Sequence, residues 1–169
     1  MKSTKKYTNQ TFAKRVDHEG GLHRAAKKLS EPSFCTECGA IYDRGRWFLT
    51  AISRKQSGFE SPNLTICPAC NQVRSGVVGG YVSVNGGFVR EHKGEIENLI
   101  ENEAHRTLED NPLSRIMQRR VSDEGLTYET TTEHLAQRIG HALRKAFDGE
   151  VSYTFSHENK VTRVNWHRD

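Results

Sequence analysis

The chain has 169 residues, a hydrophobic content of 34%, a formal net charge of +4 and a mean hydropathy of -0.75. This length and composition allow one modest hydrophobic core, or two small ones if a metal stabilises one of them. No stretch approaches the roughly 20 apolar residues that cross a bilayer, and residues 1–15 are basic and polar, unlike a secretory signal. We therefore expect a cytoplasmic protein with no membrane partner.

The positive charge is concentrated in residues 1–30. This segment has eight basic residues against Asp17 and Glu19, a net charge of +6 that leaves −2 for the other 139 residues. It lacks a sustained apolar period, which predicts an extended basic arm that becomes ordered on a polyanion such as RNA or DNA. A solubilising tail without a partner is the alternative. The candidate phosphate contacts are Lys2, Lys5, Lys6, Lys14, Arg15, Arg24, Lys27 and Lys28.

All four cysteines occur in two pairs with the same spacing, Cys35 with Cys38 and Cys67 with Cys70. Two thiolates from each of two tight turns form the ligand set of a closed tetrahedral zinc site. The alternative is two disulfides in a secreted protein, and the polar N-terminus disfavours it. The spacing therefore predicts Zn²⁺ as cofactor.

A site of this kind constrains both the backbone and the chemistry. Gly39 and Asn71, which follow the two pairs, tolerate the left-handed backbone that points amide groups at sulfur. Four thiolates leave no vacant position for water or substrate, so the metal is expected to hold structure and not to activate a nucleophile. The pattern predicts a non-enzymatic protein with no small-molecule substrate.

The segment between the cysteine pairs mixes cations with aromatic side chains. Short strands are expected at 41–42 and 47–49. The run from Tyr42 to Trp47 is able to hold phosphates while an aromatic ring stacks on an unpaired base. Core packing of Trp47 over the metal site is the competing interpretation. The candidate RNA contacts here are Arg44, Arg46, Trp47, Arg54 and Lys55.

A β-hairpin is predicted after the second pair. Residues 80–84 alternate as a strand, Asn85-Gly86 is a strong turn signal, and residues 87–89 are expected to return. The glycines nearby do not form a phosphate-binding loop, because no Gly-Lys-Ser/Thr follows them. The prediction is a zinc ribbon with a β-hairpin over residues 31–91.

Residues 93–110 show a helical period that Pro112 ends. Apolar residues recur at three- and four-residue steps on one face, and the opposite face is acidic. That face would repel nucleic acid, so it is expected to meet solvent or a basic protein. A protein-protein adaptor acting through this helix is one alternative function.

The last third predicts strands at 115–121 and 126–131, a helix at 133–147, and strands at 150–156 and 161–167. This is a small ββαββ unit within a C-terminal α+β domain of residues 92–169. A stripe on the helix, expected to be exposed, suits a phosphate backbone, although an ordinary solvated face has the same appearance. Its members are His134, Arg138, His141 and Lys145. A ribonuclease using the two histidines is disfavoured, because two helical turns separate them.

Both cysteine pairs, the Gly45-Arg46-Trp47 segment and the run from Thr130 to Leu143 resemble a bacterial zinc-ribbon family related to the Nmd-three proteins. Those proteins are adaptors of the large ribosomal subunit, and the eukaryotic ones serve its nuclear export. The resemblance covers residues 33–168 and excludes the basic arm. The adaptors have further cysteine pairs, additional domains and export signals that this chain lacks, so only ribosome or RNA binding is implied.

Together these patterns predict a non-catalytic zinc-ribbon protein that binds ribosomal RNA, with the large subunit as partner. Hibernation, assembly or rescue are possible uses. The competing classes are a DNA-binding or transcription-linked zinc ribbon and the protein-protein adaptor.

Overall fold

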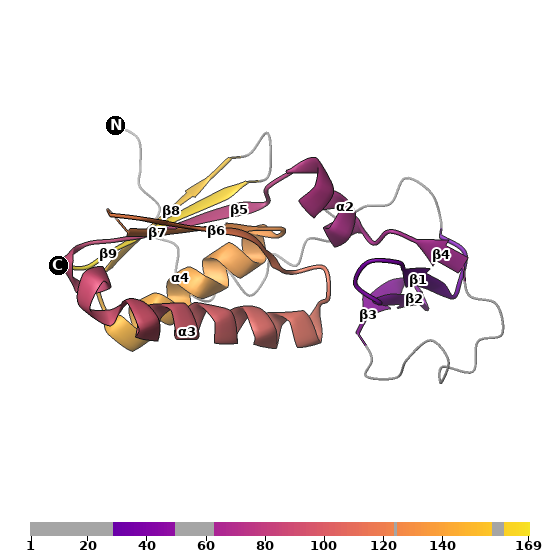
Figure 1. The fold of residues 1–169 in the computed structure, drawn as a ribbon, viewed down its shortest axis with the longest axis horizontal. Coiled ribbons are helices and arrows are strands. Elements are labelled where there is room, and N and C mark those ends of the chain that lie inside the picture. Colours follow the sequence, from indigo (N-terminus) through magenta and orange to yellow (C-terminus); the bar gives the residue numbers. More distant parts are fainter. Residues whose placement is uncertain (1–28, 50–62, 124, 157–160) are drawn as a thin grey trace, which may run out of the picture.

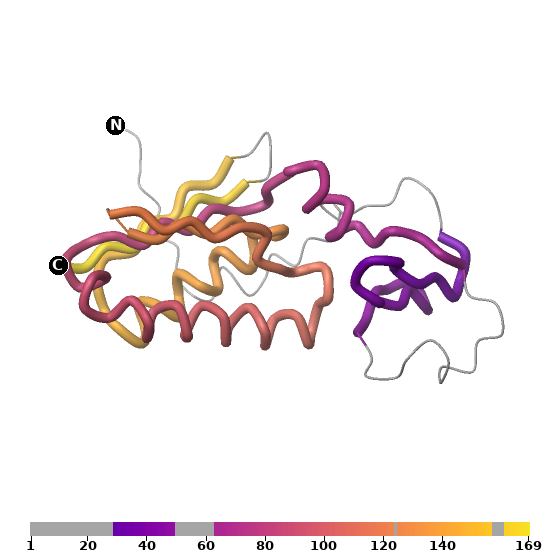
Figure 2. Tube along the Cα trace, viewed as in Figure 1, coloured from indigo at the N-terminus to yellow at the C-terminus, as the bar shows by residue number. Residues whose placement is uncertain are grey.

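The computed structural model describes residues 29–49, 63–123, 125–156 and 161–169. Residues 1–28, with the basic contacts predicted for the arm, lie outside the described residues, as do Arg54 and Lys55. The described part is a mixed α+β structure with three helices and nine strands in two sheets, in agreement with the predicted fold class. None of its helices is long and apolar enough to cross a membrane. Figures 1 and 2 show a small lobe and a large lobe, joined through helix α2.

The small lobe is a four-stranded sheet in the order β3-β2-β1-β4. Strands β1 (Ser33–Cys35), β2 (Ile41–Asp43) and β3 (Arg46–Phe48) form an antiparallel meander, and β4 (Asn63–Thr65) pairs parallel to β1. Between β2 and β3, Arg44 and Gly45 both have positive φ values of 50° and 78°. Two positive φ angles are the signature of the two-residue turn whose twist matches that of the strands it joins.

Helix α2 (Pro68–Ser75) starts inside the second cysteine pair. The Cys67 side chain caps it, Pro68 stands in its first turn, and Gly76 ends it with a left-handed φ of 66°. Proline suits a first turn because its missing amide hydrogen has no helical acceptor there, and glycine suits a left-handed cap. The second cysteine pair is therefore a helix start, which makes it more rigid than a free loop.

The large lobe is a five-stranded sheet in the order β6-β7-β5-β9-β8. Its strands are β5 (Gly80–Asn85), β6 (Ile116–Ser122), β7 (Gly125–Thr130), β8 (Glu150–Phe155) and β9 (Thr162–His167). The central strand β5 is antiparallel to β7 and parallel to β9. Helices α3 (Gly87–Asp110) and α4 (Glu133–Phe147) lie side by side under one face of the sheet (Figure 1).

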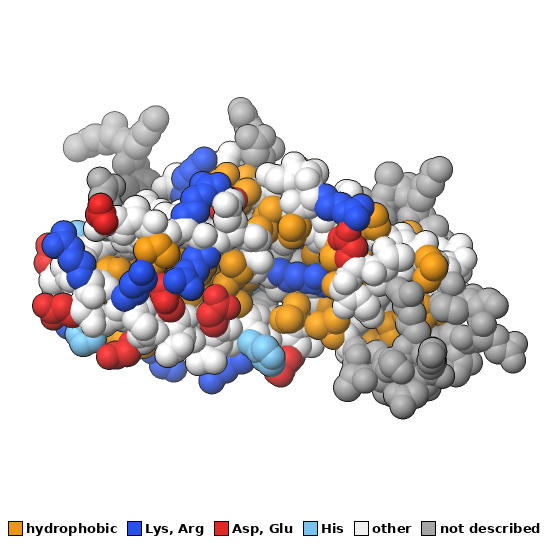
Figure 3. Space-filling model, in the orientation of Figure 1, with side chains coloured by type: hydrophobic (Ala, Val, Ile, Leu, Met, Phe, Trp, Pro, Cys, Tyr) orange, Lys and Arg blue, Asp and Glu red, His pale blue; other side chains and the backbone are white. Residues whose placement is uncertain are grey.

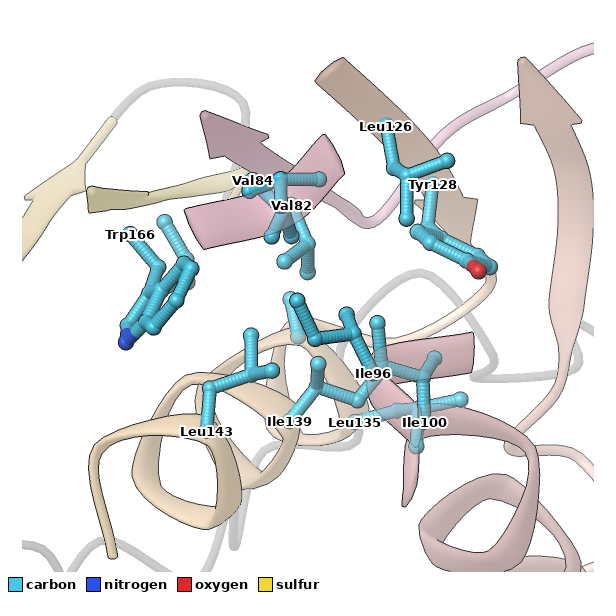
Figure 4. Close-up of a cluster of buried hydrophobic side chains, with 13 residues drawn as sticks. Val82, Val84, Ile96, Ile100, Leu126, Tyr128, Leu135, Ile139, Leu143 and Trp166 are labelled. Atoms are coloured by element: carbon cyan, nitrogen blue, oxygen red, sulfur yellow. The ribbon is translucent and has the colours of Figure 1, made fainter. Parts of the chain in front are cut away.

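Alternation along the strands and the helical period on α3 and α4 produce the core of this lobe. The strand side chains point toward the two helices, and the helices return apolar side chains to the same layer (Figure 4). The Trp166 ring is fully buried, and its indole nitrogen donates to the Asp148 carbonyl at 2.7 Å. The labelled members of this layer are Val82, Val84, Ile96, Ile100, Leu126, Tyr128, Leu135, Ile139, Leu143 and Trp166.

The hairpin predicted at 80–89 is wrong. Residues 80–85 do form a strand, but Gly86 is the N-cap of α3 and residues 87–89 are its first turn. Gly86 has a φ of 114°, and a Cβ there would lie 2.0 Å from the Arg168 carbonyl oxygen. Glycine is needed because the C-terminal backbone passes so closely, and not because the chain reverses into a hairpin.

The boundary predicted at residue 91 falls within helix α3. Strand β5 pairs with β7 and β9, so it is part of the five-stranded sheet of the large lobe. The change of lobe falls after α2. The C-terminal unit is therefore β5-α3 followed by the predicted ββαββ arrangement, and that arrangement is confirmed, with α4 at the predicted residues and the strands within one residue or so.

Candidate metal centre

The four cysteines come from two local structures, the turn that follows β1 and the start of α2. Cys35 ends β1, Cys38 lies in the turn that leads to β2, Cys67 precedes α2 and Cys70 lies in its first turn. The Cys35 amide donates to the Ala40 carbonyl at 2.8 Å, which closes the first turn. Sequence spacing thus places two sulfurs in each turn, and the sheet and helix bring the two turns together.

The sulfur positions match a tetrahedral ion. All four Sγ atoms lie within 4.8 Å of one another. The Cys35 and Cys70 sulfurs are 3.8 Å apart, and the Cys38 and Cys67 sulfurs are 3.6 Å apart. Four sulfurs placed tetrahedrally at about 2.3 Å from zinc would be separated by about 3.8 Å. None of the four cysteines forms a disulfide, so the structure agrees with the metal interpretation.

Backbone amides point at the sulfurs, as predicted. The Cys67 amide donates to the Cys35 sulfur at 3.2 Å, and the Cys70 amide donates to the Cys67 sulfur at 3.4 Å. Gly39 has the predicted left-handed backbone, with a φ of 74°. The same prediction for Asn71 is wrong, because α2 continues through that residue. The second turn gains its amide donors from a helix start, which needs no left-handed residue.

Burial and hydrogen bonding give the cysteine thiols different pKa values. Burial disfavours the charged form of Cys35, but amide donors from Cys38, Cys67 and Glu37 outweigh it and lower its pKa to about 6. Burial raises the pKa of Cys67 to about 11 and also raises the pKa of Cys70. The amide donors therefore favour the thiolate of Cys35, whereas burial disfavours the thiolates of Cys67 and Cys70. A bound metal ion would favour the thiolate form of all four, because a coordinating thiol loses its proton.

Arg115, which comes from the large lobe, contacts the cysteine cluster. Its Nη2 donates to the Cys38 sulfur at 3.0 Å, and its Nη1 approaches the Cys70 sulfur at 3.6 Å. Burial alone would lower the pKa of this guanidinium, but the Cys38 hydrogen bond and the neighbouring sulfur charges raise it. A permanent positive charge therefore faces one sulfur from each pair. This role was not predictable from the sequence, because no local pattern links Arg115 to cysteines 45 and 77 residues away.

The surroundings of the cluster are apolar and well packed. Buried Ala40 and Ala69 pack among the cysteines, and partly buried Trp47 and Leu113 cover them. Trp47 therefore takes the packing role that was the competing interpretation, while its ring stays 5.4 Å from that of Tyr42. Cys35, Cys67 and Cys70 are buried and Cys38 is partly exposed, and such shielding suits a structural metal.

Two of the predicted cations between the cysteine pairs, Arg44 and Arg46, lie at the tip of the β2–β3 hairpin. Arg46 is exposed, and the Arg44 side chain is 92% exposed, with its Nε 3.8 Å from the Asp43 carboxylate. The Glu31 carboxylate accepts hydrogen bonds from the Arg44 and Gly45 amides, both at 3.1 Å. The backbone of the tip is therefore fixed while both guanidinium groups face solvent.

Only two of the four residues in the predicted stripe on α4 are exposed. His134 and Lys145 are exposed, as expected. Arg138 is only one-third exposed, and its Nε donates to the Glu103 carboxylate at 2.8 Å. His141 lies 5.4 Å from the Tyr153 ring, and burial together with the Arg144 charge lowers its pKa. The expectation of a fully exposed stripe is wrong for these two residues, because α3 and β8 pack beside them.

Two arginines of β6 also form ion pairs within the large lobe. Arg119 pairs with Glu97 at 2.6 Å, and Arg120 pairs with Glu129 at 3.1 Å. Figure 3 shows basic and acidic side chains interspersed over this lobe, with no basic patch of one sign in that view. The acidic face predicted for 93–110 is likewise partly used in internal ion pairs, since Glu103 is buried. Among the predicted RNA contacts that the structure describes, Arg44, Arg46, His134 and Lys145 remain exposed.

Comparison with known proteins leaves the site to be interpreted from its geometry. No protein-family model matches the chain, and no curated protein matches it significantly.

Proposed function

We propose that this protein is a non-catalytic, zinc-stabilised RNA-binding protein whose partner is ribosomal RNA of the large subunit in the cytoplasm. The observation that carries the proposal is the β2–β3 tip, where Arg44 and Arg46 are exposed on a turn held by Glu31, in the lobe that carries the first cysteine pair of the four-cysteine cluster. Exposed guanidinium groups on a fixed turn can contact the phosphates of folded RNA.

Zinc is the metal that suits this site best. A set of four thiolates with sulfur separations of 3.6 and 3.8 Å fits a tetrahedral soft cation, whereas magnesium and calcium require oxygen ligands. All four positions of the ion are filled by protein, so it has no place for a reactive water. Cys35, Cys38, Cys67 and Cys70 would hold the ion, and the chemistry it supplies is structural. This supports a binding protein over a hydrolase.

RNA binding requires basic side chains that are accessible to phosphate. Arg46 is exposed and Arg44 is 92% exposed with only a long 3.8 Å ion pair to Asp43, whereas the ion pairs of Arg119, Arg120 and Arg138 with carboxylates are 2.6 to 3.1 Å long. Contact with phosphate releases condensed counterions, which makes binding weaken as salt rises. The eight basic residues of the arm are expected to add further salt-dependent phosphate contacts. The sequence motifs that resemble a ribosome-associated family are the reason for proposing RNA as the partner.

Sedimentation with purified ribosomes over a series of salt concentrations tests this function. Each phosphate contact to single-stranded RNA contributes about 0.7 to the slope of log affinity against log salt, so an Arg44→Ala, Arg46→Ala double variant should lower the slope by about 1.4. An Arg119→Ala, Arg120→Ala double variant is the matched control, because both of its arginines are paired internally. It should change the slope by much less.

Two results would contradict the proposal. The first is wild-type protein that does not sediment with ribosomes at low salt. The second is the same slope of log affinity against log salt for both double variants. Association with duplex DNA in place of ribosomes would favour the DNA-binding alternative. Salt-insensitive binding to a protein would favour the adaptor.

A deletion of residues 1–30 tests the arm separately. If the arm contributes phosphate contacts, the deletion should flatten the salt slope further. An unchanged slope would assign RNA binding to the described lobes alone.

A further inference from the structure

Arg115 links the cysteine cluster to the large lobe through a short chain of contacts. The residue follows the end of α3 and precedes β6, so its backbone belongs to the large lobe. Its side chain reaches back to the small lobe, where Nη2 lies 3.0 Å from the Cys38 sulfur and Nη1 lies 3.6 Å from the Cys70 sulfur. One guanidinium thus spans both cysteine pairs.

The guanidinium is held in place by its own lobe. Arg115 Nε donates to the Pro112 carbonyl at 2.6 Å, and its backbone amide donates to the Thr131 hydroxyl at 2.8 Å. Thr131 is buried, and its amide donates back to the Arg115 carbonyl at 2.9 Å. The neighbouring Ser114 hydroxyl bonds to the Thr132 hydroxyl, which caps α4. A side chain fixed in this way loses little freedom when it contacts sulfur.

The second connection between the lobes runs through α2. Buried Gln72 donates from Nε2 to the Thr131 carbonyl at 2.7 Å, so the helix that carries Cys70 is tied to the same threonine. The Arg74 guanidinium, at the end of α2, forms an ion pair with Glu37 from the first cysteine pair. The metal ligands, α2 and the start of α4 therefore meet in one continuous network.

Electrostatics gives Arg115 a reason to respond to metal. A divalent ion with four thiolates carries a net charge of −2, and this charge is poorly solvated because two ligand sulfurs are fully buried with Cys35 and Cys67. A guanidinium that donates to the thiolates offsets part of the charge. Hydrogen bonds to ionised acceptors are also stronger than those to neutral thiols.

We propose that Arg115 is a positioning residue of the metal centre, which strengthens metal binding and makes the bound metal lock the small lobe onto the large one. The consequence is that the β2–β3 tip and the start of α4 keep a fixed relation only when the centre is loaded. The inference rests on the metal assigned under the proposed function, but it does not depend on RNA binding.

Zinc affinity, measured by competition with a chromophoric chelator, is the first test. Removal of an outer hydrogen-bond partner commonly weakens metal binding 10- to 100-fold, so we expect a loss of about that size in Arg115→Met. Arg115→Lys keeps the charge but not the two-pronged contact, and we expect a smaller loss. Arg119→Met is the matched control, because its guanidinium pairs with Glu97 and contacts no cysteine. It should bind zinc as the wild type does.

Two further readouts separate a role at the metal from general destabilisation. Cobalt substitution reports the ligand sulfurs directly, so the sulfur-to-cobalt charge-transfer bands should shift in Arg115→Met and not in Arg119→Met. Amide relaxation by NMR reports the tumbling of each lobe. With saturating zinc, both lobes should share one correlation time in the wild type and have separate values in Arg115→Met.

Unchanged zinc affinity, unchanged charge-transfer bands or a shared correlation time in Arg115→Met would each overturn the inference while leaving the metal centre intact. If the wild type itself binds no zinc, both this inference and the metal assignment fail. No arm of the experiment contains RNA, so a failure of ribosome binding is seen separately.

Discussion

Arg138→Ala should lower stability and leave RNA binding nearly unchanged. The sequence places Arg138 in a cationic stripe, but in the structure its guanidinium donates to the buried Glu103 carboxylate at 2.8 Å. Arg106 donates to the other oxygen of the same carboxylate at 2.9 Å. Glu103 therefore joins α3 to α4, and Arg138 is the partner that crosses between the helices.

The size of the effect follows from burial. A hydrogen bond to a charged group contributes about 1.5–3 kcal/mol, but Arg138 is one-third exposed and Arg106 still serves the carboxylate in the variant. We therefore expect a loss of about 1–2 kcal/mol in the free energy of unfolding. Replacing an exposed residue without such a contact usually changes stability by less than about 0.5 kcal/mol.

Urea unfolding with saturating zinc, followed by the fluorescence of buried Trp166 in a Trp47→Phe background, measures this loss. Lys145→Ala is the control, because Lys145 is exposed on the same helix. Equal stabilities for Arg138→Ala and its parent would refute the structural role assigned to the ion pair. A drop in the salt slope of ribosome binding for Arg138→Ala would restore its place among the phosphate contacts.

Three other predictions concern packing, pH and metal. Gly140→Ala should destabilise the large lobe by about 1–2 kcal/mol in the same assay, since a Cβ would lie 2.6 Å from the Val164 side chain. The cost of this overpacking exceeds the gain of about 1 kcal/mol in helix propensity. Equal or higher stability of the variant would contradict this prediction. Because the folded-state pKa of His141 is lowered by burial and by Arg144, protonation favours the unfolded chain. Stability should be fully present above about pH 6.5 and fall as the pH drops from there through the folded pKa; His141→Gln should flatten that fall, and an identical pH profile would exclude this group as the cause. Removal of metal should unfold the small lobe and leave the large one folded, since their buried clusters are separate. Unfolding of both lobes together, seen by circular dichroism, would contradict this.

The sequence was most informative where the signal was local. Equal spacing in the two cysteine pairs predicted a cluster that the structure confirms, and the alternation in 150–167 predicted the final two strands. The helix at 133–147 was equally clear, because its apolar residues keep one face over four turns. In each case the information lies within one element.

The errors arose where distant contacts decide the backbone. Asn85-Gly86 is a strong turn signal, yet Gly86 starts α3 because the backbone of Arg168 passes close by. Asn71 was expected to be left-handed, but Pro68 starts a helix that carries it onward. Arg115 had no detectable signal, since its contacts with the cysteines exist only after both lobes have folded.

Native mass spectrometry of the purified protein, combined with thiol counting after mild denaturation, tests the central claim most directly. The account predicts one zinc ion per chain, bound by four reduced cysteines. Purified protein that carries no zinc, or in which Cys35, Cys38, Cys67 and Cys70 are joined as disulfides, would contradict it.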